Sequence, residues 1–218
     1  MPYPAKPQVL GQALLQEQTP TAMAFLRDWY GRRKITDPYI AEAFDKDKPH
    51  IMQNLKAPPQ MQVVSQIDGD PRLMGQYDAA ANRIVMTPNA DAFTPLHELT
   101  HAVNAQGQGG GYMRTIHKDI VKNEIKPRDQ QQGVYKDKYE YFASPDEVHA
   151  RVMVLREAAG FQPNKTVTEE DLDRFLKMYR GQNENINDLF NMSKDKSSVL
   201  DMLNFMAKAP TNNRRMAA

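Results

Sequence analysis

The chain has 218 residues and no cysteine, and its 28 Lys and Arg against 27 Asp and Glu give a formal net charge of +1 at pH 7. This balance offers no electrostatic basis for binding nucleic acid or a membrane surface, and we expect neither as a partner. The lack of cysteine excludes a disulfide framework, and no apolar run is long enough to cross a membrane.

The first seven residues lack the apolar core of a signal peptide. We therefore expect a cytoplasmic protein, although a protein delivered by a virion would show the same features. Three helices are predicted ahead of any strand, over residues 9–16, 21–32 and 37–55. One of them is expected to pack on the sheet that follows.

Three short segments rich in β-branched residues predict strands over residues 61–67, 73–77 and 83–87. Turn-forming residues bound them, and the middle segment has the weakest pattern. The linker at 78–82 is short enough to join the last two strands as neighbours. The local pattern therefore predicts a small antiparallel sheet.

A helix is predicted over residues 94–106, with Thr94 as N-cap and Pro95 at the first helical position, although Asp91 could open it a turn earlier. Gln106-Gly107 and the glycine run at 109–111 end it. One stripe of this helix is apolar, and a second stripe about 100° away is polar. The apolar stripe holds Leu96, Leu99 and Val103, and the polar stripe holds His97, His101 and Asn104. The first stripe is expected to pack on the sheet, while the second faces a cleft.

The motif His97-Glu98-Leu99-Thr100-His101 lies within this helix. Imidazoles four residues apart lie one turn above each other, so both can bind one metal ion from the same face. Glu98 points elsewhere and would accept a proton from water activated by the metal. The alternative is a helix that carries two surface histidines without a metal.

Three segments together resemble the core of zincin-fold metallopeptidases: Gly75-x-Tyr77-Asp78, Asn82-x-Ile84 and Leu96-His-Glu-Leu-x-His-Ala102. The resemblance covers roughly residues 60–160, and Thr100 departs from the small residue that many zincins have there. It implies an α+β fold with a small mixed sheet packed on the motif helix, and Zn²⁺ as cofactor. We expect a zincin-like domain with N-terminal helices over residues 1–160, and a C-terminal helical extension over 161–218.

A catalytic zinc needs a third protein ligand. The chain after His101 lacks the Gly-x-x-His continuation, which argues against the metzincin subtype. Glu147 resembles the third ligand of gluzincins, on a helix that Ser144 and Pro145 open. The same Ser144-x-x-Glu147 pattern is a capping box, in which the glutamate bonds only to the backbone. Other candidates for the third ligand are Glu140, His117, Glu124, His149 and Asp146.

The helix after Ser144 places Arg151 four residues beyond Glu147, where it can hold that carboxylate. His149 shares a face with Arg156 and Glu157 and is expected to be solvated. A helix over residues 113–125 carries His117 and Glu124, which could instead line the cleft. The loop at 107–112 could form its rim or serve only as a linker.

Tyr135, Tyr139 and Tyr141 precede Glu147 and are candidate donors to an oxyanion, without a choice among them. Further helices are predicted over residues 168–179, 186–192 and 197–208, and their Met and Phe stripes are expected to be core or helix contacts.

The sequence thus predicts a zinc peptidase in which His97, His101 and Glu147 hold the metal and Glu98 is the general base acting on a peptide or protein substrate. The segment at 73–77 is a candidate edge strand that would align the substrate. The main rival is a non-catalytic interaction or assembly protein with a zincin-like core. A weaker rival is a zinc hydrolase of non-peptide amides. The oligomeric state does not follow from the sequence.

Overall fold

The computed structural model describes residue 25 and residues 55–91, 93–107, 110–161 and 165–206. Eight helices and a three-stranded sheet form a mixed α and β structure within this part of the chain, as predicted. The helices predicted over 9–16, 21–32 and 37–55 lie outside the described residues, apart from Phe25, which is helical, and Leu55.

The sheet contains β1 (Gln60–Val63), β2 (Gly75–Asp78) and β3 (Arg83–Met86) in the order β1-β3-β2. β2 and β3 form the predicted antiparallel hairpin, whereas β1 is parallel to β3. Successive strands do alternate in direction, but β3 inserts between the other two, so the fully antiparallel sheet was the wrong expectation. The mixed sheet implied by the zincin resemblance is what the structure contains.

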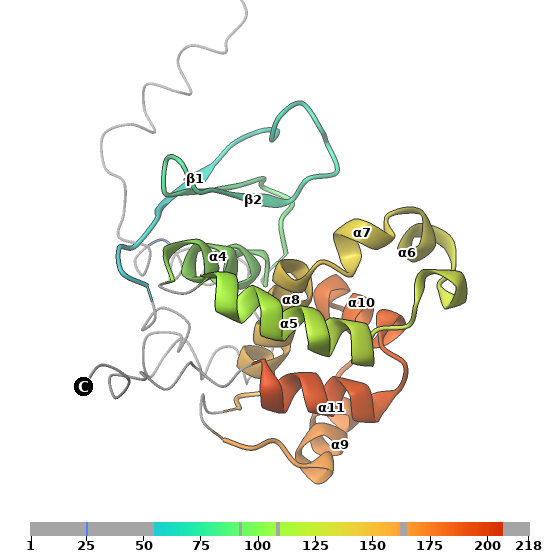
Figure 1. Ribbon diagram of the computed structural model, residues 1–218. Helices are drawn as coiled ribbons and strands as arrows, with labels where there is room; N and C mark the ends of the chain where they lie inside the picture. Colours follow the sequence, from blue (N-terminus) through green and yellow to red (C-terminus); the bar gives the residue numbers. More distant parts are fainter. Residues whose placement is uncertain (1–24, 26–54, 92, 108–109, 162–164, 207–218) are drawn as a thin grey trace, which may run out of the picture.

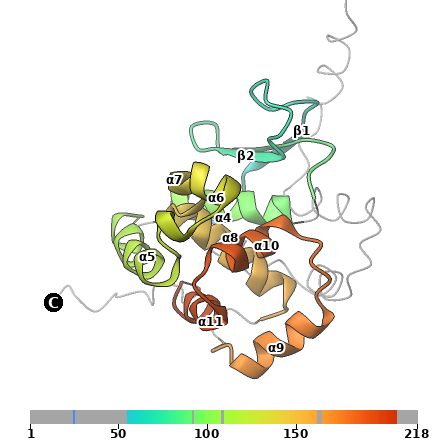
Figure 2. The same ribbon diagram turned by 90° about the vertical axis from the view of Figure 1, so that its right-hand side faces the viewer.

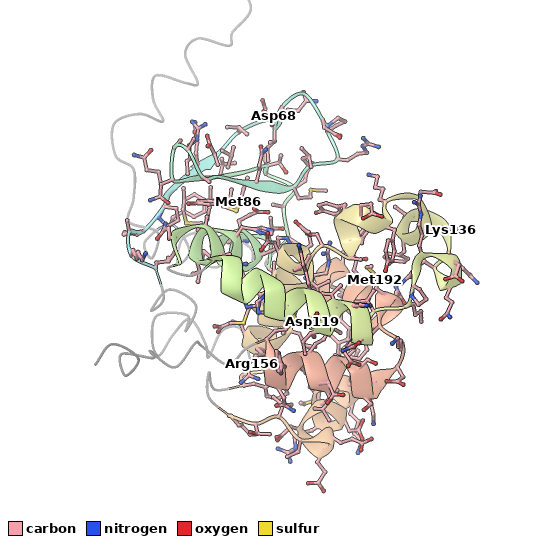
Figure 3. The ribbon with its side chains drawn as sticks, in the orientation of Figure 1. Asp68, Met86, Asp119, Lys136, Arg156 and Met192 are labelled. Atoms are coloured by element: carbon pink, nitrogen blue, oxygen red, sulfur yellow. The ribbon has the colours of Figure 1, made fainter. Side chains whose placement is uncertain are left out.

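β1 ends four residues earlier than predicted. Ile67 pairs with Asp70 across a turn in which Asp68 and Gly69 have φ values of 46° and 76°. Such left-handed backbone cannot continue a strand. Figure 3 shows Asp68 in this turn, on the side of the sheet away from the helices.

Helix α4 (Thr94–Gln106) packs along one face of the sheet, with α8 (Pro145–Ala158) on the other side of α4 (Figure 1). Ile84 and Met86 are fully buried, and Met86 lies between the sheet and α4 (Figure 3). Leu96 and Leu99 of α4 are buried as well, which confirms the predicted apolar stripe. The motif helix is therefore fixed between the sheet and the rest of the molecule.

Helix α5 (Gly110–Glu124) begins within the glycine run, three residues earlier than predicted. A 3-10 turn (Arg128–Gln130), α6 (Gly133–Asp137) and α7 (Tyr139–Phe142) lead from α5 to α8. The last three helices are α9 (Glu169–Met178), α10 (Glu184–Met192) and α11 (Lys196–Phe205). In Figure 2, α10 lies beside α8, and α9 and α11 lie below it.

Helix α8 lies at the centre of the helical part and contacts α4, α5, α10 and α11. Ten of its residues are buried, from Val148 to Ala158. Buried residues that precede and follow Gly160 in the sequence belong to one hydrophobic cluster. The helices after residue 160 therefore share a core with the part of the chain before it. Among the helices described, none is long and apolar enough to cross a membrane.

Candidate metal centre

Helix α4 brings His97, Glu98 and His101 to the site. It begins at Thr94, with Phe93 as the N-cap residue, so the predicted cap at Thr94 is one residue late. The cap oxygen comes from Asp91, whose Oδ1 accepts from the backbone N–H groups of Phe93 (2.8 Å) and Thr94 (2.7 Å). Satisfying these N–H groups stabilises the first turn of the helix, immediately before the motif.

Helix α8 brings Glu147. The Ser144 hydroxyl accepts from the Glu147 backbone N–H at 3.3 Å, as a cap should. The reciprocal half of a capping box is missing, because the Ser144 N–H donates to the Tyr141 carbonyl at 3.1 Å. The Glu147 carboxylate is therefore not held by the helix end and turns toward α4.

Three side chains from these two helices converge. The Nε2 atoms of His97 and His101 lie 3.1 Å apart. Glu147 Oε2 is 3.3 Å from His97 Nε2, and Glu147 Oε1 is 3.2 Å from His101 Nε2. In the described part of the chain, this is the one group of three such side chains close enough to share a metal ion. The predicted ligands thus form a group that could hold a metal ion.

Arg151 supports the carboxylate from behind, as its position in the helix predicts. Its Nη1 is 3.1 Å from Glu147 Oε2, and the side chain is only 4% exposed. The guanidinium also lies near the ring of Phe142, 5.1 Å from its centroid. These contacts fix the direction in which Glu147 points.

Glu147 and His101 each shift the pKa of the other. Burial acts to raise the pKa of Glu147, but hydrogen bonds with His101 and His97, together with the charges of His97 and Arg151, outweigh it and hold that pKa well below its usual range. Burial acts to lower the pKa of His101, but Glu147 outweighs it and the pKa is raised. The Glu147 carboxylate is therefore ionised, the form that binds metal.

Glu98 is buried beside the group, and desolvation raises its pKa despite the nearby imidazoles and a hydrogen bond from the backbone of Tyr77. Gly75 of β2 allows this close approach. A Cβ at Gly75 would lie 2.5 Å from Thr94 Cγ2 and 2.9 Å from Glu98 Oε1. The sequence alone assigned Gly75 no function. Its place in the segment Gly75-x-Tyr77-Asp78 was the only sign that it could matter.

These residues line a cavity of about 410 Å³ between β2, α4 and the start of α8. Asn104 contributes to its wall, so the predicted polar stripe of α4 does face a cleft. The other lining residues are Leu73, Gly75, Gln76, Tyr77, His97, Glu98, His101, Ala105, Tyr141, Asp146 and Glu147.

Of the three candidate tyrosines, Tyr141 lines this cavity, as does Glu147. Tyr135 instead donates to Asp188 Oδ1 at 2.8 Å. Burial and the Glu147 charge raise the pKa of Tyr141, which keeps its hydroxyl protonated. Tyr139 is not among the residues that line the cavity.

The other candidates for the third ligand are not part of the group. Glu140 is exposed on α7, and neither His117 nor Glu124 lines the cavity. Asp146 lines it but does not complete the group. Residues 108 and 109 of the predicted rim loop lie outside the described residues.

The expectation that His149 is solvated was wrong. His149 is buried, its Nδ1 is 3.1 Å from Asn104 Oδ1, and its ring lies 4.6 Å from that of His117. Helix α8 is packed on nearly every side, so a face opposite its apolar stripe is still inside the protein. Burial and the nearby charges of His117 and His101 lower the pKa of His149 to about 3.

Comparison of the chain with protein-family models, with curated proteins and with solved structures gave no match.

Proposed function

We propose that this protein is a zinc-dependent peptidase with its active site in the cavity between β2 and α4. The observation that carries the proposal is the convergence of His97, His101 and Glu147 from two helices beside a buried glutamate. Metal-assisted hydrolysis uses a set of metal ligands together with a nearby carboxylate that does not bind the metal and can accept a proton.

The distances are compatible with a bound zinc ion. Ligands about 2.05 Å from a tetrahedral zinc ion are separated from one another by about 3.3 Å. The three distances within the group are 3.1, 3.3 and 3.2 Å. Two imidazoles and one carboxylate leave the fourth tetrahedral position open, which is typical of catalytic rather than structural zinc sites. A bound zinc ion supplies a Lewis acid that acidifies water and polarises a carbonyl group.

Glu98 is the proton acceptor in this proposal. It directly follows His97 in the helix and lines the same cavity, yet it is not part of the ligand group. A carboxylate at this place can take the proton of the attacking water and pass it to the leaving amine. Gly75, which has no Cβ, leaves the space that the Glu98 carboxylate occupies beside β2.

The cavity wall favours a peptide as substrate. β2 lies at the edge of the sheet and, within the described residues, pairs only with β3. The Thr87 N–H donates to the Met74 carbonyl at 2.9 Å, so the alternation of an antiparallel ladder turns the peptide groups of Gly75 and Tyr77 toward the free edge. An extended peptide can add to such an edge through its backbone.

Tyr141 lines the same cavity from the side of α7, and its hydroxyl is protonated. We assign it the role of donor to the oxygen of the scissile carbonyl. This choice among the three predicted tyrosines depends on its place in the cavity wall, since Tyr135 is engaged by Asp188.

The test is digestion of a diverse peptide library by the zinc-loaded protein and by its Glu98→Gln variant. Loss of a general base typically costs about 10²- to 10⁴-fold in turnover, while zinc content and thermal stability should stay near wild type. Glu140→Gln is the matched control, because it makes the same change on the exposed surface of α7 and should cleave normally.

Two results would count against the proposal. A zinc-loaded wild type that cleaves no peptide in the library would favour the interaction-protein alternative, in which the zincin-like core has a structural role. Equal cleavage by Glu98→Gln and wild type would remove the proposed base.

A further inference from the structure

Arg151 places a positive charge next to a carboxylate of the candidate metal centre. Its guanidinium is buried and lies 3.1 Å from an oxygen of Glu147. It orients that carboxylate, but a cation so close also competes with a metal ion for the same oxygen and repels the metal. The site therefore needs a second anion that draws the guanidinium charge away from Glu147.

Asp188 of α10 is placed to do this. Its Oδ2 lies 3.6 Å from Arg151 Nε, and its side chain is 21% exposed. Arg151 thus lies between two carboxylates, with Glu147 near its Nη1 and Asp188 near its Nε. Two carboxylates around one guanidinium leave the set with one net negative charge, which favours binding of a cation by Glu147.

Asp188 is itself held in place. The Tyr135 hydroxyl donates to Asp188 Oδ1 at 2.8 Å, and the Asn191 side-chain amide donates to the same hydroxyl at 3.0 Å. A continuous chain of contacts therefore runs from Glu147 through Arg151 and Asp188 to Tyr135 and α10.

Helix α10 is also tied to the other ligand-bearing helix. Asn183, its N-cap residue, donates from Nδ2 to Asp91 Oδ2 at 2.9 Å. The other oxygen of Asp91, Oδ1, caps α4. One helix of the C-terminal part thus contacts the support of both helices that carry metal ligands.

We propose that Asp188 is a positioning residue of the metal centre, which neutralises Arg151 and thereby holds Glu147 in its metal-binding orientation. This inference rests on the proposed function, because it takes the His97, His101 and Glu147 group to bind zinc. It makes α10 part of the site rather than a helix that only adds to the core.

The experiment measures zinc affinity by competition with a chelator, using the full chain. Asp188→Asn keeps the size of the side chain and its acceptor for Tyr135 but removes the charge opposite Arg151. Supporting residues beyond the ligands typically contribute about 10- to 100-fold in metal affinity, and we expect a loss of at least about 10-fold. Thermal unfolding of the metal-free protein shows whether the variant is folded.

Asp173→Asn is the matched control. It removes the same charge from α9, where Asp173 forms an exposed ion pair with Lys196 at 2.9 Å, and should leave zinc affinity unchanged. The route through Arg151 is tested in an Arg151→Met background. There Asp188→Asn should cause no further loss, because the group through which it acts is absent.

Unchanged zinc affinity in a folded Asp188→Asn variant would overturn this inference and leave the proposed function intact. A full further loss in the Arg151→Met background would also overturn it. Should Asp188→Asn not fold, Tyr135→Phe decides, since it removes only the hydroxyl that holds Asp188, and unchanged affinity there refutes the inference. A wild type that binds no zinc would overturn both this inference and the proposed function.

Discussion

The described part of the molecule contains two close pairs of histidines, and their surroundings differ in whether a carboxylate joins the pair. His97 and His101 come from one helix and share the carboxylate of Glu147, which Arg151 holds. His117 and His149 come from different helices and lie with their rings 4.6 Å apart, against the amide of Asn104. Within the described residues, only the first pair belongs to a group of three metal-binding side chains.

The comparison shows that burial and proximity do not make a metal site by themselves. Both pairs contain a buried histidine, but the pKa of His149 is lowered to about 3, mainly by burial, and its imidazole is neutral. For His101, Glu147 outweighs the same effect of burial and raises the pKa. An anion that is itself oriented by other residues turns two imidazoles into a group that could hold a cation.

The largest effect is expected when that anion is neutralised. Glu147→Gln keeps the backbone N–H that the Ser144 hydroxyl caps, so α8 should form as before. The amide is a poor zinc ligand, and zinc affinity should fall by more than the roughly 100-fold that loss of a supporting residue can cause. Competition with a chelator measures it. An unchanged affinity would mean that Glu147 is not a ligand and would return the assignment to Asp146 or another candidate.

A smaller effect, of a different kind, is expected at the second pair. His149→Phe keeps a ring in the site but leaves the Asn104 oxygen without its donor. Such an orphaned buried acceptor costs about 1 to 3 kcal/mol, measurable as a lower denaturation midpoint. Zinc affinity should stay within about threefold of wild type, because His149 is not one of the residues of the ligand group. A loss of zinc comparable to that of Glu147→Gln would contradict the distinction between the two pairs.

The sequence was most informative where the signal is local. The spacing of His97 and His101 specifies a shared face on any helix, and Asn104 follows on the same stripe. Ser144 and Pro145 marked the start of α8 and hence the register of Glu147 and Arg151, which the structure has as predicted. The hairpin of β2 and β3 was also predictable, because a short turn joins neighbouring strands.

What the sequence could not show depends on contacts between distant segments. The position of β3 between β1 and β2 is decided by packing and not by strand propensity. His149 was misjudged because a helix with one apolar stripe is usually exposed on the other side, whereas α8 contacts five other helices in the described part of the chain. Asp188 lies far from Arg151 in the sequence, and no motif connects them. Its proposed role depends on the packing of α10 against α8.

The most direct test of the central claim is native mass spectrometry of the purified protein, which weighs the folded chain with its bound metal. Two imidazoles and one carboxylate at these distances predict about one zinc ion per chain in wild type. His97→Ala and His101→Ala should each remove it, while His149→Phe should retain it. A wild type without zinc, or zinc retained in full by His97→Ala and His101→Ala, would contradict the account.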